Sequence, residues 1–116
     1  MKELILILIV GSLFMGCFMY TTQNLSKSSK VQAGMTIEEV LEIMGEPVIS
    51  ELDRNVEEWH YCKTGIKDKY LAIFFVDNKV SAKIFYTQSK GGGDCSLFVK
   101  TGDYKVPSEI QAILEK

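Results

Sequence analysis

The chain has 116 residues, with 13 basic and 15 acidic side chains and a formal net charge of −2 at neutral pH. This balance argues against a nucleic-acid-binding protein, because such proteins usually carry an excess of basic residues on one face. The length allows one domain, and about eighty residues remain for it once the N-terminal segments are set aside. So small a domain has a marginal hydrophobic core, and a covalent cross-link would stabilise it.

Residues 1–20 form an apolar leader. Lys2 precedes an uncharged apolar run from Leu4 through Tyr20, and a basic start followed by an apolar core is typical of an export signal. As a helix the run would span about 25 Å, slightly short of the ~30 Å hydrocarbon core of a bilayer. We therefore predict a signal peptide of the lipoprotein type over residues 1–16, and an uncleaved membrane anchor is the alternative.

The leader ends in LFMGC, residues 13–17, which resembles a bacterial lipobox. Gly16 is the small residue before the modified cysteine, although Leu13 lies four residues before Cys17, where the usual pattern has three. Cys17 is the predicted lipidation site, carrying fatty acyl chains such as palmitate; unmodified, it would be a small apolar side chain of a membrane helix. Both interpretations attach the chain to a membrane. Residues 17–31 are predicted to form a polar tether, since Ser, Thr and Lys dominate after the leader.

The stretch GMTIEEVLEIMGEP, residues 34–47, predicts a helix with both ends marked. Thr36 is placed to cap the N-terminus, and Glu39 completes a capping box with it. Gly45 suits the position that ends a helix, and Pro47 prevents its continuation. The apolar residues spaced for one face of this helix are Ile37, Val40, Leu41 and Met44.

Three strands are predicted after this helix, over Val56–Cys62, Tyr70–Val76 and Lys79–Tyr86. The Asp-Asn pair at 77–78 provides a hairpin turn between the last two. The three strands form an antiparallel β-meander, and the apolar side of the helix needs one face of it as a partner. The fold class is therefore α+β, with one or two N-terminal helices packed on a three-stranded antiparallel meander.

Alternation along the strands assigns side chains to the faces of the sheet. Trp59 and Tyr61 share one face of the first strand, and Glu58, His60 and Cys62 share the other. On the third strand one face is predicted to hold Val80, Ala82, Ile84 and Tyr86.

The last segment, VPSEIQAILEK at 106–116, predicts a short C-terminal helix. Ser108 and Gln111 have the spacing of a capping box. Ile110, Ile113 and Leu114 fall on one side of the helix. This side either packs on the domain or docks on a partner, and the sequence does not decide between the two.

Cys62 and Cys95 are predicted to form a disulfide. The first and third strands of a meander run in the same direction, so the loop 87–94 can return Cys95 to the end of the sheet where Cys62 lies. In an exported protein two such cysteines indicate a disulfide. The alternative is a thiol enzyme, in which Cys62 or Cys95 would be reduced and reactive near His60.

The sequence offers no convincing reaction centre. His60 and Cys62 can form a nucleophile and base pair on one strand face, but a polar strand residue beside a structural cysteine explains them better. As a metal site, His60, Cys62 and Cys95 lack a fourth ligand and the paired spacings of zinc sites. The glycine run at 91–93 lacks the Lys and Ser or Thr of a phosphate-binding loop. We therefore expect no enzyme, no metal, no cofactor and no small-molecule substrate.

The Gly-Met-Thr, Met-Gly-x-Pro and Trp-x-Tyr series resembles the SmpA/OmlA (BamE-like) family, with features similar to its OsmE-like members. The matching positions are Gly34, Met35, Thr36, Val40, Gly45, Pro47, Trp59, Tyr61, Phe74 and Val80. The resemblance implies that residues 32–116 form such a domain in a bacterial lipoprotein, anchored to the periplasmic face of the outer membrane. The implied role is protein interaction, accessory to the assembly of outer-membrane β-barrel proteins or to envelope integrity, with partners such as a β-barrel assembly complex.

The resemblance does not identify the partner-binding residues. The fold also resembles that of β-lactamase inhibitory proteins, so an inhibitor or binding protein for an exported enzyme is the alternative function. Exposed aromatic side chains on the outer face of the sheet would indicate it. The aromatic residues placed to serve in this way are Phe85, Phe98 and Tyr104.

Overall fold

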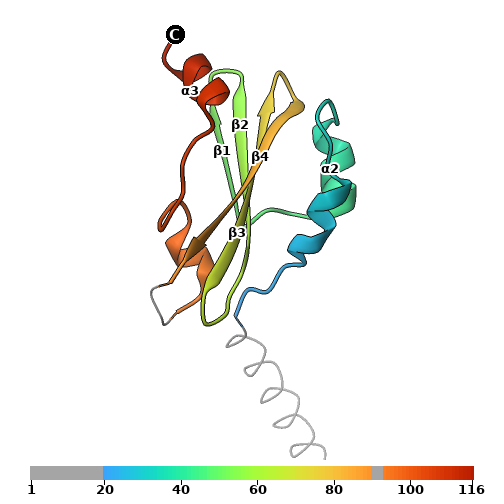
Figure 1. Cartoon of the computed structure of the whole chain (residues 1–116). Coiled ribbons are helices and arrows are strands. Elements are labelled where there is room, and N and C mark those ends of the chain that lie inside the picture. Colours follow the sequence, from blue (N-terminus) through green and yellow to red (C-terminus); the bar gives the residue numbers. More distant parts are fainter. Residues whose placement is uncertain (1–19, 90–92) are drawn as a thin grey trace, which may run out of the picture.

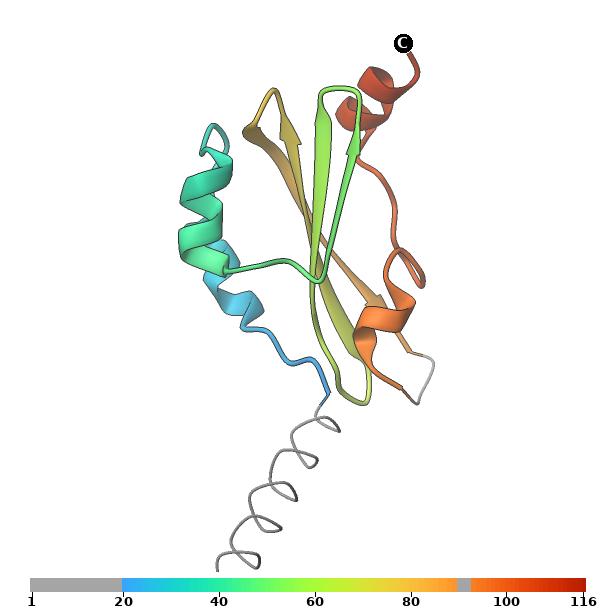
Figure 2. The ribbon, with the colours of Figure 1, turned by 180° about the vertical axis from the view of Figure 1, so that it is seen from behind.

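The computed structural model describes residues 20–89 and 93–116. In chain order its elements are η2 (Leu25–Lys30), α2 (Ile37–Met44), β1 (Ile49–Asp53), β2 (Val56–Lys63), β3 (Asp68–Val76), β4 (Lys79–Gln88), η3 (Cys95–Phe98) and α3 (Ser108–Leu114). The strands form one antiparallel sheet in the order β1-β2-β3-β4. The helices η2 and α2 lie on one face, and the other face is lined by η3, the connecting residues 99–107 and α3 (Figures 1 and 2). We name residues 99–107 the strap.

The predicted leader lies outside the described residues. This holds for the signal peptide, 1–16, and for the predicted lipidation site Cys17. Among the helices of residues 20–89 and 93–116, none has the length and apolar character needed to cross a membrane.

The helix α2 has the ends that the sequence predicts. The Thr36 side chain accepts a hydrogen bond from the Glu39 N–H at 3.2 Å, and the Glu39 carboxylate accepts one from the Thr36 N–H at 3.3 Å. Gly45 ends the helix at a φ of 78°, which favours glycine. The apolar face of α2 differs from the predicted one at one residue. Leu41 is 36 % exposed, and Ile43, three residues after the fully buried Val40, packs on the core in its place.

The first face of the sheet forms a core with α2 and η2. Trp59 and Tyr61 lie on this face, as alternation predicts, and the Trp59 ring meets the Phe75 ring edge-on at 4.8 Å between centroids. The Tyr61 hydroxyl donates a hydrogen bond to the Gly45 carbonyl at 2.8 Å. This bond satisfies a backbone acceptor at the end of α2 and fixes the helix on the sheet.

The sheet has four strands, so the predicted three-stranded meander is wrong in its strand number. The additional strand, β1, pairs with β2 as an edge strand, with Glu51 opposite Glu58. After Ile49 every side chain of β1 is exposed. Because no face of this strand is buried, its sequence lacks the alternation of apolar and polar residues that would predict a strand. Backbone pairing with β2, and not burial, makes this segment a strand.

The predicted face of β4 is interrupted by a bulge. Phe74 pairs with Ala82 and Phe75 with Val80, so Ser81 is an extra residue on β4. Such an insertion reverses the alternation beyond it. Val80 therefore joins the core beneath α2, and the three residues that pack on the opposite face are Ala82, Ile84 and Tyr86.

Residues 21–31 pack on the domain, whereas the sequence predicts a tether. Thr22 pairs with Lys63 as an isolated β-bridge, and Leu25 and Val31 are buried in the first core. Lys83 donates hydrogen bonds to the carbonyls at the end of η2, at 2.6 Å and 2.9 Å. Two apolar residues in a polar segment are enough to attach it because the sheet provides a surface for them. Residues 21–31 are therefore part of the folded domain, which the sequence predicts to begin at residue 32.

The C-terminal helix packs on the second face of the sheet, and Ile110 is fully buried there. The predicted cap at Ser108 is wrong: Pro107 occupies the N-cap, and the Gln111 side chain donates to Glu115 within the helix. At the other end, the Arg54 guanidinium in the β1–β2 turn donates to the Lys116 carbonyl at 2.6 Å. Arg54 also donates to the Ile113 carbonyl, in the last turn of α3, at 3.4 Å, so its side chain ties the C-terminal end of α3 to the β1–β2 turn.

The strap lies close to β4 at a glycine. Gly102 has a φ of 66°, and a Cβ at this position would lie 2.0 Å from the Thr87 carbonyl oxygen. The Asp103 N–H donates to the same carbonyl at 3.2 Å. Only glycine allows this approach, so the strap is fitted to the end of β4.

Replacing Ile110 by Ala should destabilise the protein by about 2 to 5 kcal/mol, because it leaves a cavity between α3 and the sheet. Leu52→Ala is the matched control, since Leu52 is 70 % exposed and its change should stay near 0.5 kcal/mol. Urea unfolding followed by circular dichroism measures both. Equal stability of Ile110→Ala and the wild type would show that α3 does not pack on the domain.

Candidate functional site

The predicted disulfide between Cys62 and Cys95 is present, with an S–S distance of 2.02 Å. Cys62 is near the end of β2, Cys95 begins η3, and both are fully buried. The bond attaches η3 to β2. It thereby fastens the start of the second layer, the name used here for η3, the strap and α3 on the second face of the sheet. With both sulfur atoms in a disulfide, neither cysteine is a thiol nucleophile for His60.

Asp94, next to this disulfide, joins three segments of the chain. One carboxylate oxygen accepts from the Thr21 hydroxyl at 2.7 Å, and the other accepts from the Thr64 hydroxyl at 3.3 Å. Burial acts to raise the pKa of Asp94, but the hydrogen bonds from Ser96 and Thr21 outweigh it and lower the pKa to about 2. The N-terminal segment, the β2–β3 loop and η3 therefore meet at one end of the sheet.

His60 lies in a buried polar cluster on the second face. Its Nδ1 is 2.8 Å from the Tyr86 hydroxyl, and its Nε2 is 2.8 Å from Glu58 Oε2. The other carboxylate oxygen of Glu58 accepts from the Tyr104 hydroxyl at 2.6 Å, and Lys100 Nζ lies 3.0 Å from Oε2. Glu58 and His60 come from β2, Tyr86 from β4, and the remaining two from the strap.

The charges of this cluster are set by its hydrogen bonds. Burial acts to raise the pKa of Glu58, but donors on His60, Tyr104 and Lys100 together lower it to about 2. Burial first, and then the Glu58 carboxylate, raises the pKa of the Tyr104 hydroxyl, and burial also raises that of Tyr86. The cluster therefore consists of one carboxylate surrounded by donors, with both phenols neutral at physiological pH.

A carboxylate, an imidazole and a phenol in a row can also form an acid–base relay. Here the His60 ring is fully buried, and both its nitrogens are engaged by protein groups. Throughout the described residues every buried side-chain nitrogen and oxygen has a hydrogen-bond partner, and no three His, Cys, Asp or Glu are grouped to hold a metal ion. The arrangement fits a polar clamp that fastens the strap to β2 and β4.

The aromatic residues proposed for a binding face do not form one surface. Phe85 is 60 % exposed, whereas Phe98 and Tyr104 are half-buried and pack on the second core. By the ordinary alternation of a strand, Phe85 lies on the opposite face of the sheet from Tyr86, which packs in the second core with Phe98 and Tyr104. Three aromatic residues that look alike in the sequence thus have different surroundings.

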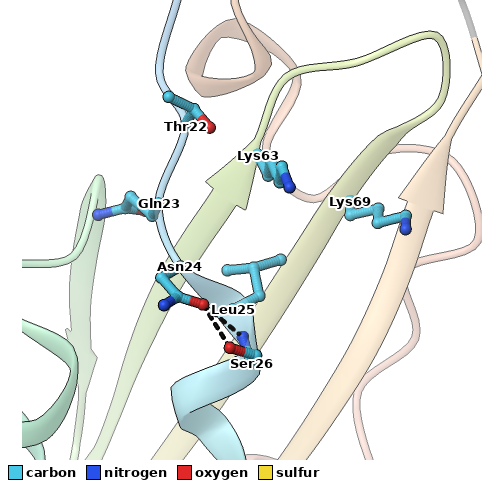
Figure 3. A pocket seen from close by; sticks show the side chains of 7 residues that line it. All are labelled: Thr22, Gln23, Asn24, Leu25, Ser26, Lys63 and Lys69. Carbon is cyan, nitrogen blue, oxygen red and sulfur yellow. Dashed lines mark hydrogen bonds between the residues drawn. The ribbon is translucent and has the colours of Figure 1, made fainter.

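A hollow of about 430 Å³ opens where the N-terminal segment crosses the sheet (Figure 3). Thr22 through Ser26 form one side of it, and Lys63 and Lys69 line the other. These two lysines are directly opposite each other on β2 and β3, where like charges are unfavourable. The sequence alone does not mark these two lysines, because a lysine at a strand end is ordinary until its cross-strand partner is known.

The fold is a small α+β domain in which η2 and α2 cover one face of the sheet, and η3, the strap and α3 cover the other. The model of one family, described as the outer membrane protein assembly factor BamE domain, matches residues 21–84. This is more than half of the chain, so the protein belongs to the BamE family, and the resemblance stated from the sequence is confirmed. Comparison with curated proteins gives no match.

The family match covers one part of the structure and leaves the rest outside it. It begins at residue 21 and so includes residues 21–31 of the segment predicted as a tether, and it covers η2, α2, the first three strands and the first part of β4. It ends at residue 84, before η3, the strap and α3. The disulfide and the polar clamp therefore join a matched strand, β2, to a layer that lies outside the match.

Replacing both Cys62 and Cys95 by Ala should lower the free energy of unfolding by about 3 to 4 kcal/mol, because the unfolded chain regains the freedom of the loop between them. Urea unfolding of the variant and of the oxidised and reduced wild type measures this. The reduced wild type should match the variant. Unfolding free energies within about 1 kcal/mol of each other for all three, roughly the effect of an average point substitution, would contradict a stabilising role.

Glu58→Gln should destabilise the protein by about 1.5 to 3 kcal/mol at pH 7, the range for hydrogen bonds to a charged group. The folded pKa of Glu58 lies below its ordinary value of 4.5. Its contribution is therefore complete above pH 5 or so and is lost as the pH falls towards about 2, so the difference from the wild type should narrow with acidification.

The control for this variant is Glu42→Gln, at an exposed position of α2. Unfolding midpoints in urea between pH 7 and pH 2.5, roughly the window that linkage defines for Glu58, compare the three proteins. A gap between Glu58→Gln and the wild type that does not depend on pH would contradict the ionic character of the clamp.

Proposed function

We propose that this protein is an accessory factor of the bacterial outer membrane, acting by protein–protein contact in the assembly of β-barrel proteins or in envelope integrity. The observation that carries the proposal is the match of the BamE domain to residues 21–84. The structure supports it with a scaffold in which both faces of the sheet are covered. A disulfide stabilises this scaffold, as suits a protein outside the reducing cytoplasm.

The second part of the proposal is a lipid anchor on Cys17 that holds the domain at the periplasmic face of the outer membrane. Gly16 and Cys17 stand at the end of an export-like leader. Thr22, only a few positions after this cysteine in the sequence, already pairs with Lys63 as an isolated β-bridge. The attached domain would therefore lie close to the bilayer surface, with little free chain between them.

The third part is that the role requires no catalysis. The imidazole of His60 is enclosed, and the cysteines on the same face are bonded to each other. A scaffold for partners needs stability and a surface, and the buried clusters contribute to stability. The partner in this proposal is a β-barrel assembly complex, and its contact residues on this chain stay unassigned.

An inhibitor or binding protein for an exported enzyme is the competing proposal. Of the three aromatic residues that it was built on, Phe85 alone is largely exposed. Photo-crosslinking in the native envelope separates the two functions. A photoreactive residue at Leu41, Leu52 or Phe85 should crosslink to a subunit of the β-barrel assembly complex, and crosslinks only to a soluble exported enzyme would favour the competing proposal.

Cys17→Ala should release the protein from the membrane fraction, or leave it as an unprocessed precursor, because the lipid acceptor is lost. Mass analysis of the mature N-terminus checks this: the wild type should begin at Cys17 and carry diacylglyceryl. Ser89→Ala, at an exposed position away from the leader, is the control and should stay in the membrane fraction. A wild-type chain that begins at Met1 would contradict lipidation and favour an uncleaved anchor.

A further inference from the structure

The chain enters the domain at a fixed place. Tyr20 is 59 % exposed, and directly after it Thr21 and Gln23 are bound to the sheet. The Thr64 N–H donates to the Thr21 carbonyl at 2.9 Å, and the Gln23 N–H donates to the Cys62 carbonyl at 3.1 Å. These bonds, with those of Thr21 to Asp94, fix where the leader attaches relative to the sheet. A leader anchored in a bilayer therefore brings this end of the sheet to the membrane.

The loop between β2 and β3 lies at the same end and carries an exposed apolar side chain. Ile66 is 101 % exposed, the highest value among the large apolar side chains of the described residues. The loop itself is ordered, since the Gly65 N–H donates to the buried Asp68 carboxylate at 3.1 Å. Single exposed apolar side chains are common on protein surfaces, but covering this one would be favourable, because it would remove the whole side chain from water.

Lysines surround this tip. Lys63, Lys67 and Lys69 are all exposed. A hollow of about 300 Å³ joins them, and it is lined by Lys63, Thr64, Gly65, Ile66, Lys67 and Lys69. None of the ion pairs among the described residues includes any of the three lysines.

The acidic residues nearest in the chain do not neutralise these lysines by pairing with them. Asp68 is buried and bound to the Gly65 amide. Asp94 is bound to Thr21, Thr64 and Ser96. Lys63 and Lys69, opposite each other across β2 and β3, therefore add their charges to that of Lys67. The end of the sheet where the chain enters thus presents an apolar tip within a positively charged collar.

We propose that this leader-end surface, formed by Tyr20, Lys63, Ile66, Lys67 and Lys69, docks on the anionic lipid surface of the membrane that holds the leader. Ile66 enters the boundary between headgroups and acyl chains, where burial covers its side chain. The lysines bind lipid phosphates and keep their amino groups in the headgroup layer. The inference rests on the proposed membrane attachment and adds a second contact to it.

A domain held at the membrane by both its leader and this surface has a defined orientation. A domain held by one flexible tether would be free to rotate. The β2–β3 loop and the chain entry lie at one end of the sheet, and the β1–β2 and β3–β4 turns lie at the other (Figures 1 and 2). Docking at the first end directs the second end away from the bilayer. The turn at Arg54 and the helix α3 that it caps would then face partners in the aqueous space.

Tryptophan fluorescence of the full-length, leader-bearing protein tests the docking. Ile66→Trp places a probe at the tip, and Leu52→Trp places the matched probe on β1, near the turn at the far end. Both native positions are exposed, 101 % and 70 %, so neither substitution disturbs the core. The proteins are reconstituted into phosphatidylcholine vesicles with brominated acyl chains, with and without about 30 mol % phosphatidylserine, an anionic lipid that attracts basic segments.

Bromine should quench Ile66→Trp at least about threefold more than Leu52→Trp in the anionic vesicles, because quenching reports a probe at the acyl boundary. Changing the three lysines to Gln in the Ile66→Trp protein should reduce its quenching to the Leu52→Trp level. High salt, at about 0.5 M, should have a similar effect by screening. Equal quenching of the two probes in vesicles that carry the protein would overturn the docking and leave the anchoring intact.

Vesicle flotation, measured on the same samples, reports the anchoring separately. Full-length protein that does not float with vesicles of either composition would overturn both the membrane attachment and the docking that rests on it. Protein that floats, with quenching of Ile66→Trp unaffected by anionic lipid or by the lysine changes, would overturn the electrostatic part of the contact. Near-ultraviolet circular dichroism verifies that each variant keeps the native packing.

Discussion

The structure depends on one constraint: β3 is apolar on both of its faces, and both must be covered. From Tyr70 to Phe75 every side chain of β3 is buried. The residues facing one side meet α2 and η2, and those facing the other meet the strap and α3. An antiparallel sheet of this size often leaves one face in water. Here the second layer is a necessity, because exposing Tyr70, Ala72 and Phe74 would forfeit much of the small core.

The two layers are attached by different means. The first is held mainly by apolar contact, through a capped helix whose end is bound by the Tyr61 hydroxyl. The second contains the short helices η3 and α3 joined by irregular backbone, and it is fastened by the disulfide and the Glu58 clamp. A charged clamp under a strap is stable only while the carboxylate keeps all of its donors, since an unpaired buried charge is costly. This explains why residues that resemble a catalytic relay serve the architecture instead.

The same arrangement bears on function. The family match stops before the second layer, yet that layer covers the second face of the sheet and carries α3 to the end of the sheet opposite the β2–β3 loop (Figure 1). In the proposed docking, the end of the domain with Ile66 and its lysines is directed to the membrane, and the distal end is formed by two turns and α3. A factor that works beside a membrane-embedded partner would use both, the first for placement and the second for contact. The packing of residues 21–31 on the sheet makes this polarity a property of the fold.

Features set by neighbouring residues could be read from the sequence. The capping box of Thr36 and Glu39, the Asp77–Asn78 turn and the alternation on β2 each depend on side chains a few positions apart, and the disulfide followed from meander topology. Features set by distant partners could not be read. The edge strand β1, the bulge at Ser81 that divides β4 between two cores, and the attachment of the supposed tether all depend on a surface that exists only after the sheet forms. The clamp is the clearest case, because Glu58, Tyr86 and Tyr104 are ordinary polar or aromatic residues in the sequence. Only the folded chain brings them within hydrogen-bond distance, where burial and mutual donation determine their charges.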